Sequence, residues 1–408
     1  MFRKTFLPVV FVLTMLGSAA QHPFKFDNTI YKAVYLNEAF HLMDSMQNYL
    51  LLDVRSPGEY ADTSRSTALN IGRIRGSVNI TIDSVPARLN ELTKYKDQPV
   101  FIYCSHSQRS RRVSKFLAEN GFKKVYNING GMTQLNELDN HDFPFKDKVL
   151  TTHLAYKNID SKDAFHLIKN TPGLVIVDIR TPAEFASGDT LQQNNIGHLK
   201  NALNFPQAVF AEKLNASHIP ANSPVLLYDL NGYNSMDVVD LLKAKGFTSI
   251  YNLFEGLEGF ISDHRLNHEQ IKELVADAPP YHLVDPVTCI DLLEKHPDMV
   301  IIDTRPADEF NNKASMGHAN LGRMKGAILL SSPDSLENII LQKNRSALFL
   351  VYGAGSDAGT IVCRELIKKG FLHVYLLSQG LYHFVWSTAN VENCKAGKEF
   401  LTNHEGLY

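Results

Sequence analysis

The residue best suited to covalent chemistry is Cys104, the only cysteine in the first third of the chain. It follows the apolar run Phe101-Ile102-Tyr103, which predicts a buried strand, and it precedes a predicted helix that ends at Gly121. The N–H groups of the loop and the positive end of the helix favour the thiolate form of a cysteine at this position. Arg109 adds a positive charge five residues further on. The pattern makes Cys104 a strong candidate for a catalytic nucleophile.

The unit that positions Cys104 occurs three times in the chain. An Asp-x-Arg motif after an apolar run recurs at intervals of 125 residues, at Asp53, Asp178 and Asp303. A second motif, a glycine followed by a basic residue, recurs at the same interval, at Gly72, Gly197 and Gly322. A register kept over such lengths indicates tandem copies of one structural unit.

Each copy alternates predicted helices and strands. Helices are expected at 37–46, 161–169 and 286–295, and apolar strands at 100–103, 225–228 and 347–352. This alternation predicts an α/β protein of three tandem domains, each with a mainly parallel central sheet flanked by helices. We place the domains at 27–147, 150–264 and 282–408, with a linker at 265–281 that contains a predicted helix at 269–275. Ligands of such folds bind beyond the carboxyl ends of the strands, where Cys104 lies.

Together these motifs resemble the rhodanese family of sulfurtransferases. The resemblance rests on Asp53-x-Arg55 with Glu59-Tyr60, on Gly72-Arg73-Ile74-Arg75-Gly76, on the Cys104 loop and on Gly130-Gly131. It extends over almost the whole mature chain as three tandem rhodanese-like domains. One departure is shared by all three: the stretches 61–71, 186–196 and 311–321 are longer than expected for the family. A shared insertion favours triplication of one ancestral unit.

The resemblance implies a sulfurtransferase in which Cys104 attacks a donor such as thiosulfate and carries the sulfur as a persulfide to cyanide or a thiol. Arg109 would then bind the anionic donor or stabilise the persulfide. The remaining loop residues are assigned to substrate binding: Ser105, His106, Ser107, Gln108 and Ser110. Arg111 and Arg112 are expected to steer anions toward the site. Ser107 stands where the family has glycine, so it is strained if that position needs a positive φ.

Four residues of the first unit are assigned to structure instead: Asp53, Arg55, Glu59 and Gly131. Asp53 and Arg55 also occur in the copies that lack a nucleophile, and Arg55 is expected to pair with Glu59. Gly131 is expected to allow a tight turn. At the Cys104 position the second copy has Asp229, which would repel an anion, and the third has Gly353. Both later domains are therefore predicted to be non-catalytic, with a role in burying surface against the first domain or in binding a protein partner.

Two other functions stay open. The three modules could form a non-catalytic scaffold in which Cys104 is a relic or a redox sensor. The loop could also carry out phosphatase-type or arsenate-type chemistry. Four residues separate Cys104 from Arg109, whereas the related phosphatases on this fold have five, so the shorter loop favours sulfur.

Other features of the sequence concern the location of the protein and the ligands it is not expected to bind. Residues 1–20 resemble a secretory signal peptide, with a basic start, an apolar run and a small-residue exit, so we expect export to the periplasm or the medium and no membrane span in the mature chain. The net charge of −2 without a basic stripe argues against nucleic-acid binding. The histidines lack metal-ligand spacing, so we expect no metal and no cofactor. At most one disulfide is expected, among Cys289, Cys363 and Cys394.

Overall fold

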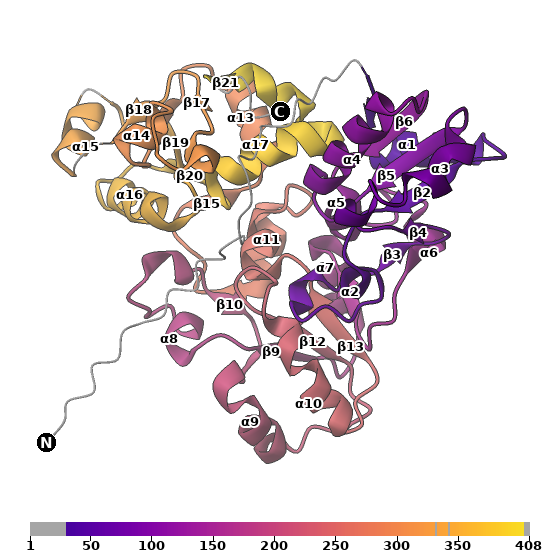
Figure 1. The fold of residues 1–408 in the computed structure, drawn as a ribbon. Helices are drawn as coiled ribbons and strands as arrows, with labels where there is room; N and C mark the ends of the chain where they lie inside the picture. The colour runs from indigo at the N-terminus through magenta and orange to yellow at the C-terminus, as the bar shows by residue number, and fades with distance from the viewer. Residues whose placement is uncertain (1–29, 331–332, 342, 404–408) are drawn as a thin grey trace, which may run out of the picture.

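The computed structural model describes residues 30–330, 333–341 and 343–403, and it shows an α/β chain of three units (Figure 1). We call them units 1, 2 and 3 in chain order. The predicted signal peptide at 1–20 lies outside the described residues. No helix within the described part of the chain has the length and apolar character needed to cross a membrane.

Each unit is built on a five-stranded parallel sheet, as the alternation of elements predicts. In unit 1 the strand order is β1-β6-β5-β2-β4, with β1 at Lys32–Val34, β6 at Lys124–Ile128, β5 at Pro99–Tyr103, β2 at Leu50–Asp53 and β4 at Val78–Asn79. The central strand β5 leads into Cys104. The nucleophile therefore lies at the middle of the carboxyl edge of the sheet.

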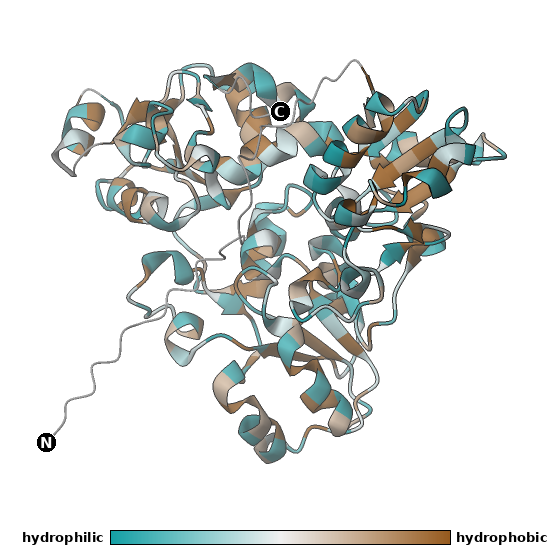
Figure 2. Cartoon of the chain, viewed as in Figure 1, coloured by the Kyte–Doolittle hydropathy of each residue, from teal (hydrophilic) through white to brown (hydrophobic). Residues whose placement is uncertain are grey.

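Both faces of this sheet are covered, which explains the unbroken apolar runs in β2 and β5. Along β5 the side chains alternate between two cores: Val100 and Ile102 pack on one face, and Phe101 and Tyr103 pack on the other. Figure 2 shows the resulting brown strands between helices with teal outer surfaces. Cys104 continues the alternation and joins the same core as Ile102.

Units 2 and 3 repeat this topology. The order in unit 2 is β11-β9-β12-β13-β8, at Leu203–Asn204, Val175–Asp178, Val225–Tyr228, Ile250–Leu253 and Lys157–Ile159. The order in unit 3 is β15-β20-β19-β16-β18, at His282–Val284, His373–Leu377, Leu348–Tyr352, Val300–Asp303 and Ile328–Leu329. A short antiparallel pair also accompanies each unit: β3–β7, β10–β14 and β17–β21, at Arg73–Ile74 with Leu150–Thr151, His198–Leu199 with Val275–Ala276, and Arg323–Met324 with Leu401–Thr402.

The first helix of each unit forms close to its predicted range: α1 at Leu36–Asp44, α7 at Ser161–Asn170 and α13 at Pro286–Lys295. Side-chain caps fix two of these starts, because Asp160 accepts hydrogen bonds from the first turn of α7 and Asp285 does so for α13. The predicted linker helix is α12 at His268–Leu274.

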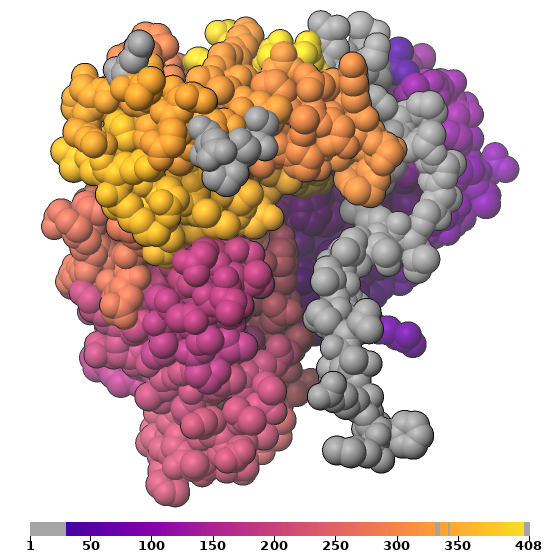
Figure 3. Space-filling model, turned by 90° about the vertical axis from the view of Figure 1, so that its left-hand side faces the viewer, coloured from indigo at the N-terminus to yellow at the C-terminus, as the bar shows by residue number. Residues whose placement is uncertain are grey.

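Units 2 and 3 share a continuous hydrophobic core. It includes Leu257 and Phe260 of unit 2 together with Leu283 and Phe349 of unit 3, and Figure 3 shows unit 3 lying directly on unit 2. The insertions also link the units. The insertion of unit 1 reaches unit 2, where Thr67 Oγ1 donates to Asp237 at 2.5 Å. In unit 2 the carbonyl oxygen of Asn195, within the insertion, accepts a hydrogen bond from Arg364 of unit 3 at 2.7 Å.

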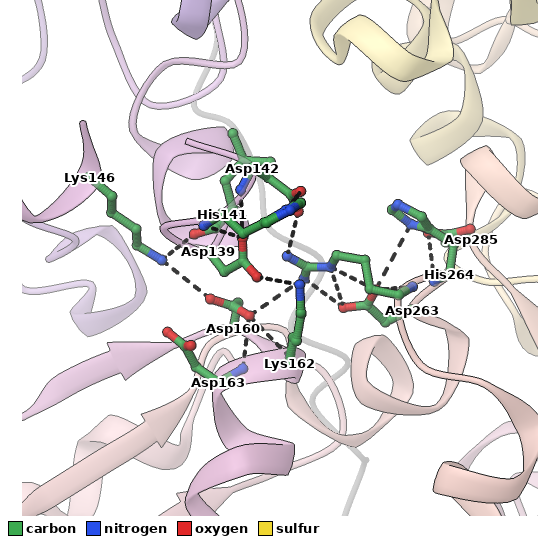
Figure 4. Close-up of polar contacts among 12 residues, drawn as sticks. Asp139, His141, Asp142, Lys146, Asp160, Lys162, Asp163, Asp263, His264 and Asp285 are labelled. Carbon is green, nitrogen blue, oxygen red and sulfur yellow. Dashed lines mark hydrogen bonds and ion pairs between the residues drawn. The ribbon is translucent and has the colours of Figure 1, made fainter. Parts of the chain in front are cut away.

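A charge network lies where the units meet (Figure 4). Arg265 pairs with Asp263 at 2.6 Å and reaches Asp142 of unit 1 at 3.4 Å, while Lys162 pairs with Asp139 at 2.9 Å. These pairs join α7, the end of unit 1 and the start of the linker. They help to hold unit 1 against unit 2, because each buried carboxylate has a cation from the other unit or from the linker.

Candidate active site

Cys104 begins the loop between β5 and α4 (Gln108–Glu119), and its exposed fraction is only 1%. The loop is held from behind by the start of α5 (Gly131–Glu137). The N–H groups of Met132 and Thr133 donate to the carbonyl oxygens of Cys104 and Ser105, at 3.0 and 3.1 Å. The backbone of the nucleophile is therefore fixed by the helix that follows the Gly130-Gly131 turn.

Gly131 makes that close approach possible. Its φ is +54°, and a Cβ atom there would lie 2.2 Å from the carbonyl oxygen of Cys104. The predicted role of Gly131 as a turn residue is thus only part of its function, since a side chain at this position would displace the loop that carries the nucleophile.

We expect Gly131→Ala to lower stability by about 3 kcal/mol or more and to impair Cys104 reactivity, because backbone must move to remove the contact. Gly76→Ala is the matched control. Gly76 also has a positive φ, +82°, but nothing lies within 4 Å of its added Cβ, so it should cost only about 1 kcal/mol. Thermal unfolding and thiol alkylation of both variants measure the difference. Equal losses in the two variants would contradict the steric explanation.

Ser107 adopts the strained conformation that the sequence raised as a possibility, with φ +71°. At the equivalent position unit 2 has Gly232, with φ +80°. The loop shape is therefore retained despite the serine. The Ser107 Oγ accepts a hydrogen bond from the Gly130 N–H at 2.6 Å, and this bond between loop and turn offsets part of the backbone strain.

Arg109 forms a bidentate ion pair with Glu59, with N–O distances of 2.7 and 2.6 Å. The same guanidinium donates to Ser105 Oγ at 2.9 Å. Burial opposes the charge on both groups, but their mutual hydrogen bonds outweigh it: the pKa of Glu59 is lowered, and the pKa of Arg109 is raised by Glu59 and by the Cys104 sulfur. Glu59 was predicted to be structural, and its position shows that it also orients the site cation.

His106 is exposed at the rim of the loop, and its Nδ1 lies 2.9 Å from Ser105 Oγ. Loss of hydration around the imidazole lowers the pKa of His106 to about 4, and the positive charge of Arg109 acts in the same direction. The ring is therefore neutral at neutral pH and does not supply a positive charge to the site.

This gives a prediction for the pH dependence. Because His106 does not titrate between about pH 5 and 8, His106→Gln should leave the acid limb of the kcat/KM profile in place. The profile of each protein is measured with the same donor. A displacement of the acid limb by more than about half a pH unit in the variant would show that His106 ionises during turnover.

The predicted pairing of Arg55 with Glu59 is wrong. Arg55 forms a buried pair with Asp53 at 2.7 Å, and its Nη2 also donates to the Gly72 carbonyl at 2.8 Å. The backbone explains the choice, because the carboxylate of Asp53 also accepts the Arg55 N–H two residues on. Arg180 and Arg305 make the same two contacts in the other units. This repetition supports a structural role for the Asp-x-Arg motif.

Three further expectations about the loop need correction. Arg111 does not steer anions: it is buried and donates to Asn129 Oδ1 at 2.9 Å. The hydroxyls of Ser107 and Ser110 point into unit 1, where Ser110 donates to Asn127 at 2.6 Å. Ser107 and Ser110 can therefore contact a substrate only through their backbone N–H groups. Gln108 is half-buried and Arg112 is exposed.

Unit 2 shows what the loop N–H groups can bind. Asp229 stands at the Cys104 position, and its carboxylate accepts hydrogen bonds from the N–H groups of Gly232 and Asn234, the latter at 2.7 Å. Burial raises the pKa of Asp229 against the effect of these bonds. Asp229 thus fills its own loop. The equivalent N–H groups in unit 1 belong to Ser107 and Arg109, so an anionic group attached to Cys104 would meet the same donors.

In unit 3 a carboxylate from another unit contacts the corresponding loop. Glu258 of α11 (Gly256–Ser262) accepts hydrogen bonds from Ser356 Oγ, from Ser378 Oγ at 3.0 Å and from the Gln379 N–H at 3.0 Å. Ser356 has φ −84°, so this loop differs in shape from the loops of the other units. Units 2 and 3 therefore lack a cysteine at the position of Cys104, and in each of them a carboxylate contacts the corresponding loop.

Two clusters have donor atoms that could surround a metal ion: Asp139, His141 and Asp142, and Asp263, His264 and Asp285. Protein groups already engage both clusters (Figure 4). Arg265 binds Asp263 through two nitrogens, and His264 Nδ1 lies 2.6 Å from Asp285. Their contacts assign them to the charge network between units.

The fold and the site together define an α/β domain that presents a cysteine in an N–H-lined loop at the carboxyl edge of a parallel sheet. The chain belongs to the rhodanese family. The model of the Rhodanese-like domain matches residues 37–138, 161–263 and 286–385, which together are most of the chain.

Curated relatives match one unit at a time. The uncharacterized protein YqhL of Bacillus subtilis (strain 168) is 37% identical over 81 residues, 20% of this chain and 56% of its own length. The thiosulfate sulfurtransferase GlpE of Tolumonas auensis is 31% identical over 81 residues, 20% of this chain and 66% of its own. The tRNA uridine(34) hydroxylase of Cytophaga hutchinsonii is 30% identical over 111 residues, 26% of this chain and 33% of its own. This chain thus spans between a third and two thirds of the length of these relatives.

The sequence alone did not show the contacts between the Cys104 loop and unit 3. The indole of Trp386 donates to the His106 carbonyl at 3.2 Å, and Asn390 contacts Arg111 at 3.2 Å. These residues are separated by about 280 positions. The chain contains a single tryptophan, but no spacing in the sequence connects it with the site.

Proposed function

We propose that the chain transfers sulfane sulfur from a small anionic donor such as thiosulfate to a thiophile through a persulfide on Cys104. The observation that carries the proposal is the carboxylate of Asp229 bound by the loop N–H groups of unit 2. The loop of unit 1 begins with Cys104 as the loop of unit 2 begins with Asp229, because each residue directly follows the central strand of its sheet. It therefore supplies hydrogen-bond donors for a negative charge that extends beyond the cysteine sulfur.

In the first half-reaction the Cys104 thiolate attacks the outer sulfur of thiosulfate. A new S–S bond forms on Cys104, the S–S bond of the donor breaks, and its electron pair leaves with sulfite. The persulfide anion accepts hydrogen bonds from the loop N–H groups. In the second half-reaction cyanide or a thiolate attacks the terminal sulfur, and the electron pair of that S–S bond returns to Cys104 as thiolate.

Arg109 serves the anionic species in both steps. Its guanidinium interacts with the Cys104 sulfur and is held in place by Glu59. Since Glu59 neutralises part of its charge, the site is suited to hold and release small anions in turn, instead of retaining the product sulfite.

The test is the production of thiocyanate from thiosulfate and cyanide by the purified protein. A persulfide intermediate predicts parallel double-reciprocal plots, because the first product leaves before the second substrate reacts. Converging plots would exclude this route, and the absence of turnover with thiosulfate, with persulfide donors and with other sulfane donors would remove the proposal. Cys104-dependent hydrolysis of an aryl phosphate would favour the phosphatase alternative.

We also propose that the protein is exported, on the basis of the apolar run and small residues within 1–20. Expression of the full chain in a bacterial host tests this. A mature protein in the periplasmic or extracellular fraction that begins after Ala20 is the expected result. A full-length protein in the cytoplasmic fraction would contradict it.

A further inference from the structure

One helix of unit 3, α17 (Gly380–Asn390), makes hydrogen bonds to the Cys104 loop and to the segments on either side of it. It has 11 residues, whereas the equivalent helices α5 and α11 have 7 each. In Figure 1 the yellow helix α17 runs from unit 3 toward α4 and α5 of unit 1. The additional turn of α17 is the part that makes most of this contact.

That turn binds the two backbone segments that hold Cys104. Asn390 Oδ1 accepts hydrogen bonds from the Gly130 N–H at 3.3 Å and from Arg111 Nη2 at 3.2 Å. Arg111 Nη2 also donates to the Ala389 carbonyl at 3.0 Å. Arg111 belongs to α4, which begins at the end of the Cys104 loop, and Gly130 belongs to the turn behind it. The end of α17 is therefore fixed to both sides of the site.

Trp386 lies one turn earlier on α17 and contacts the loop itself. Its Nε1 donates to the His106 carbonyl at 3.2 Å, and its ring lies 6.3 Å from the His106 ring in an edge-on arrangement. The ring of His383, also on α17, stacks on the indole of Trp386 with 6.1 Å between the ring centroids. An aromatic rim contributed by two units therefore stands beside the loop whose cysteine is almost completely buried.

We propose that Trp386 is a positioning and selectivity residue of the Cys104 site: it holds the His106 segment in place and limits the size of molecules that reach the sulfur. Unit 3 thereby completes the site of unit 1 and restricts it to small donors and acceptors. The description of these molecules as sulfur donors and acceptors rests on the proposed function, whereas the size limit does not.

The test measures access to the sulfur without requiring turnover. Second-order rate constants for alkylation of Cys104 are determined with iodoacetamide and with a bulky aromatic maleimide. All four cysteines are buried, but burial raises the pKa of the thiols of Cys289, Cys363 and Cys394. Cys104→Ser measures their background reaction. The readout is the rate with the bulky reagent divided by the rate with the small one, which a general loss of stability does not raise selectively.

We expect Trp386→Ala to raise this ratio about tenfold and Trp386→Phe to raise it by about threefold, because phenylalanine is smaller and lacks the N–H donor. Tyr382→Ala is the matched control: it removes an aromatic ring from the same helix at a position that is 58% exposed, and its ratio should equal that of wild type. If Trp386→Ala does not fold, Trp386→Phe decides alone.

An unchanged ratio in the folded Trp386 variants would overturn the inference. Sulfur transfer with an unchanged ratio would leave the proposed function intact and remove only the role of Trp386. A raised ratio in a protein that transfers no sulfur would support the size limit set by Trp386 and remove the proposed function. If the protein transfers sulfur and Trp386→Ala also raises the ratio, this variant should transfer sulfur to a bulky thiol faster, relative to cyanide, than wild type does.

Discussion

Cys104→Ser is expected to abolish sulfur transfer, with a loss of roughly 10³-fold or more in kcat/KM. Serine has nearly the same size as cysteine, and Cys104 belongs to the core on one face of the sheet, so the fold should be retained. A hydroxyl at this position is a far weaker nucleophile toward sulfur, and units 2 and 3 offer no replacement, since Asp229 and Gly353 occupy the equivalent positions. Initial rates and circular dichroism measure the two effects.

Cys363→Ala is the control for the Cys104 result. Cys363 is buried in α16 (Asp357–Lys368) of unit 3 and lies outside the Cys104 loop. It should lose stability through the cavity left by the sulfur and keep its specific activity. If Cys363→Ala lost as much activity as Cys104→Ser, or if Cys104→Ser remained active, the assignment of the nucleophile would be wrong.

Arg109→Ala is expected to have the second largest effect, through both activity and stability. Loss of the cation beside Cys104 should reduce kcat/KM by about 10²-fold. It also leaves Glu59, whose side chain is 4% exposed, without its ion-pair partner, which should lower stability by about 3 kcal/mol. Arg109→Lys should recover part of the stability and less of the activity, because an ammonium cannot form the bidentate pair.

The pH dependence of this loss follows from Glu59. Because Arg109 lowers the pKa of Glu59 in the folded protein, the pair stabilises the fold above the ordinary pKa of 4.5, and this stability is lost as the pH falls through the folded value. The gap in stability between wild type and Arg109→Ala should therefore narrow below pH 4.5. Denaturant unfolding at several pH values measures it. A gap that stays constant into acid would show that the charge of Glu59 does not cause the loss.

The combination Arg109→Ala with Glu59→Gln separates the two effects. The double variant should regain stability, since no unpaired carboxylate remains buried, but it should not regain activity. Recovery of both would mean that Arg109 acts only by neutralising Glu59.

Much of the fold follows from local sequence. The apolar run before Cys104 predicts β5, and Asp285 and Pro286 fix the start of α13, which forms over the predicted residues 286–295. The position of Cys104 follows as well, because it comes directly after the last residue of β5 and therefore lies at the carboxyl edge of the sheet. The three repeats made the prediction of the elements more certain, since each element expected in one unit could be compared with its counterparts in the other two.

The site was predicted less completely, for two physical reasons. Arg55 chooses Asp53 over Glu59 because the carboxylate of Asp53 also accepts the Arg55 backbone N–H. That choice frees Glu59 for Arg109, a pairing across 50 positions that the sequence does not indicate. The sequence predicts that Arg111 is a surface cation on its helix. In the structure α17 of unit 3 packs against it, and the Ala389 carbonyl accepts a hydrogen bond from its guanidinium. Contacts between units are set by packing, which local patterns do not contain.

The departure at Ser107 illustrates the difference between a motif and its geometry. A serine in place of glycine raised doubt about the loop, but Ser107 takes the same left-handed conformation as Gly232 and uses its hydroxyl to bind the Gly130 N–H. The backbone shape that binds anions therefore does not depend on glycine at this position.

The most direct test is the intact mass of the purified protein after incubation with thiosulfate and removal of excess donor. We predict a gain of one sulfur atom, located on the peptide that contains Cys104, lost on addition of cyanide and absent in Cys104→Ser. A wild-type protein that gains no sulfur from any sulfane donor, or that gains it equally in Cys104→Ser, would contradict the proposal that Cys104 carries sulfur as a persulfide.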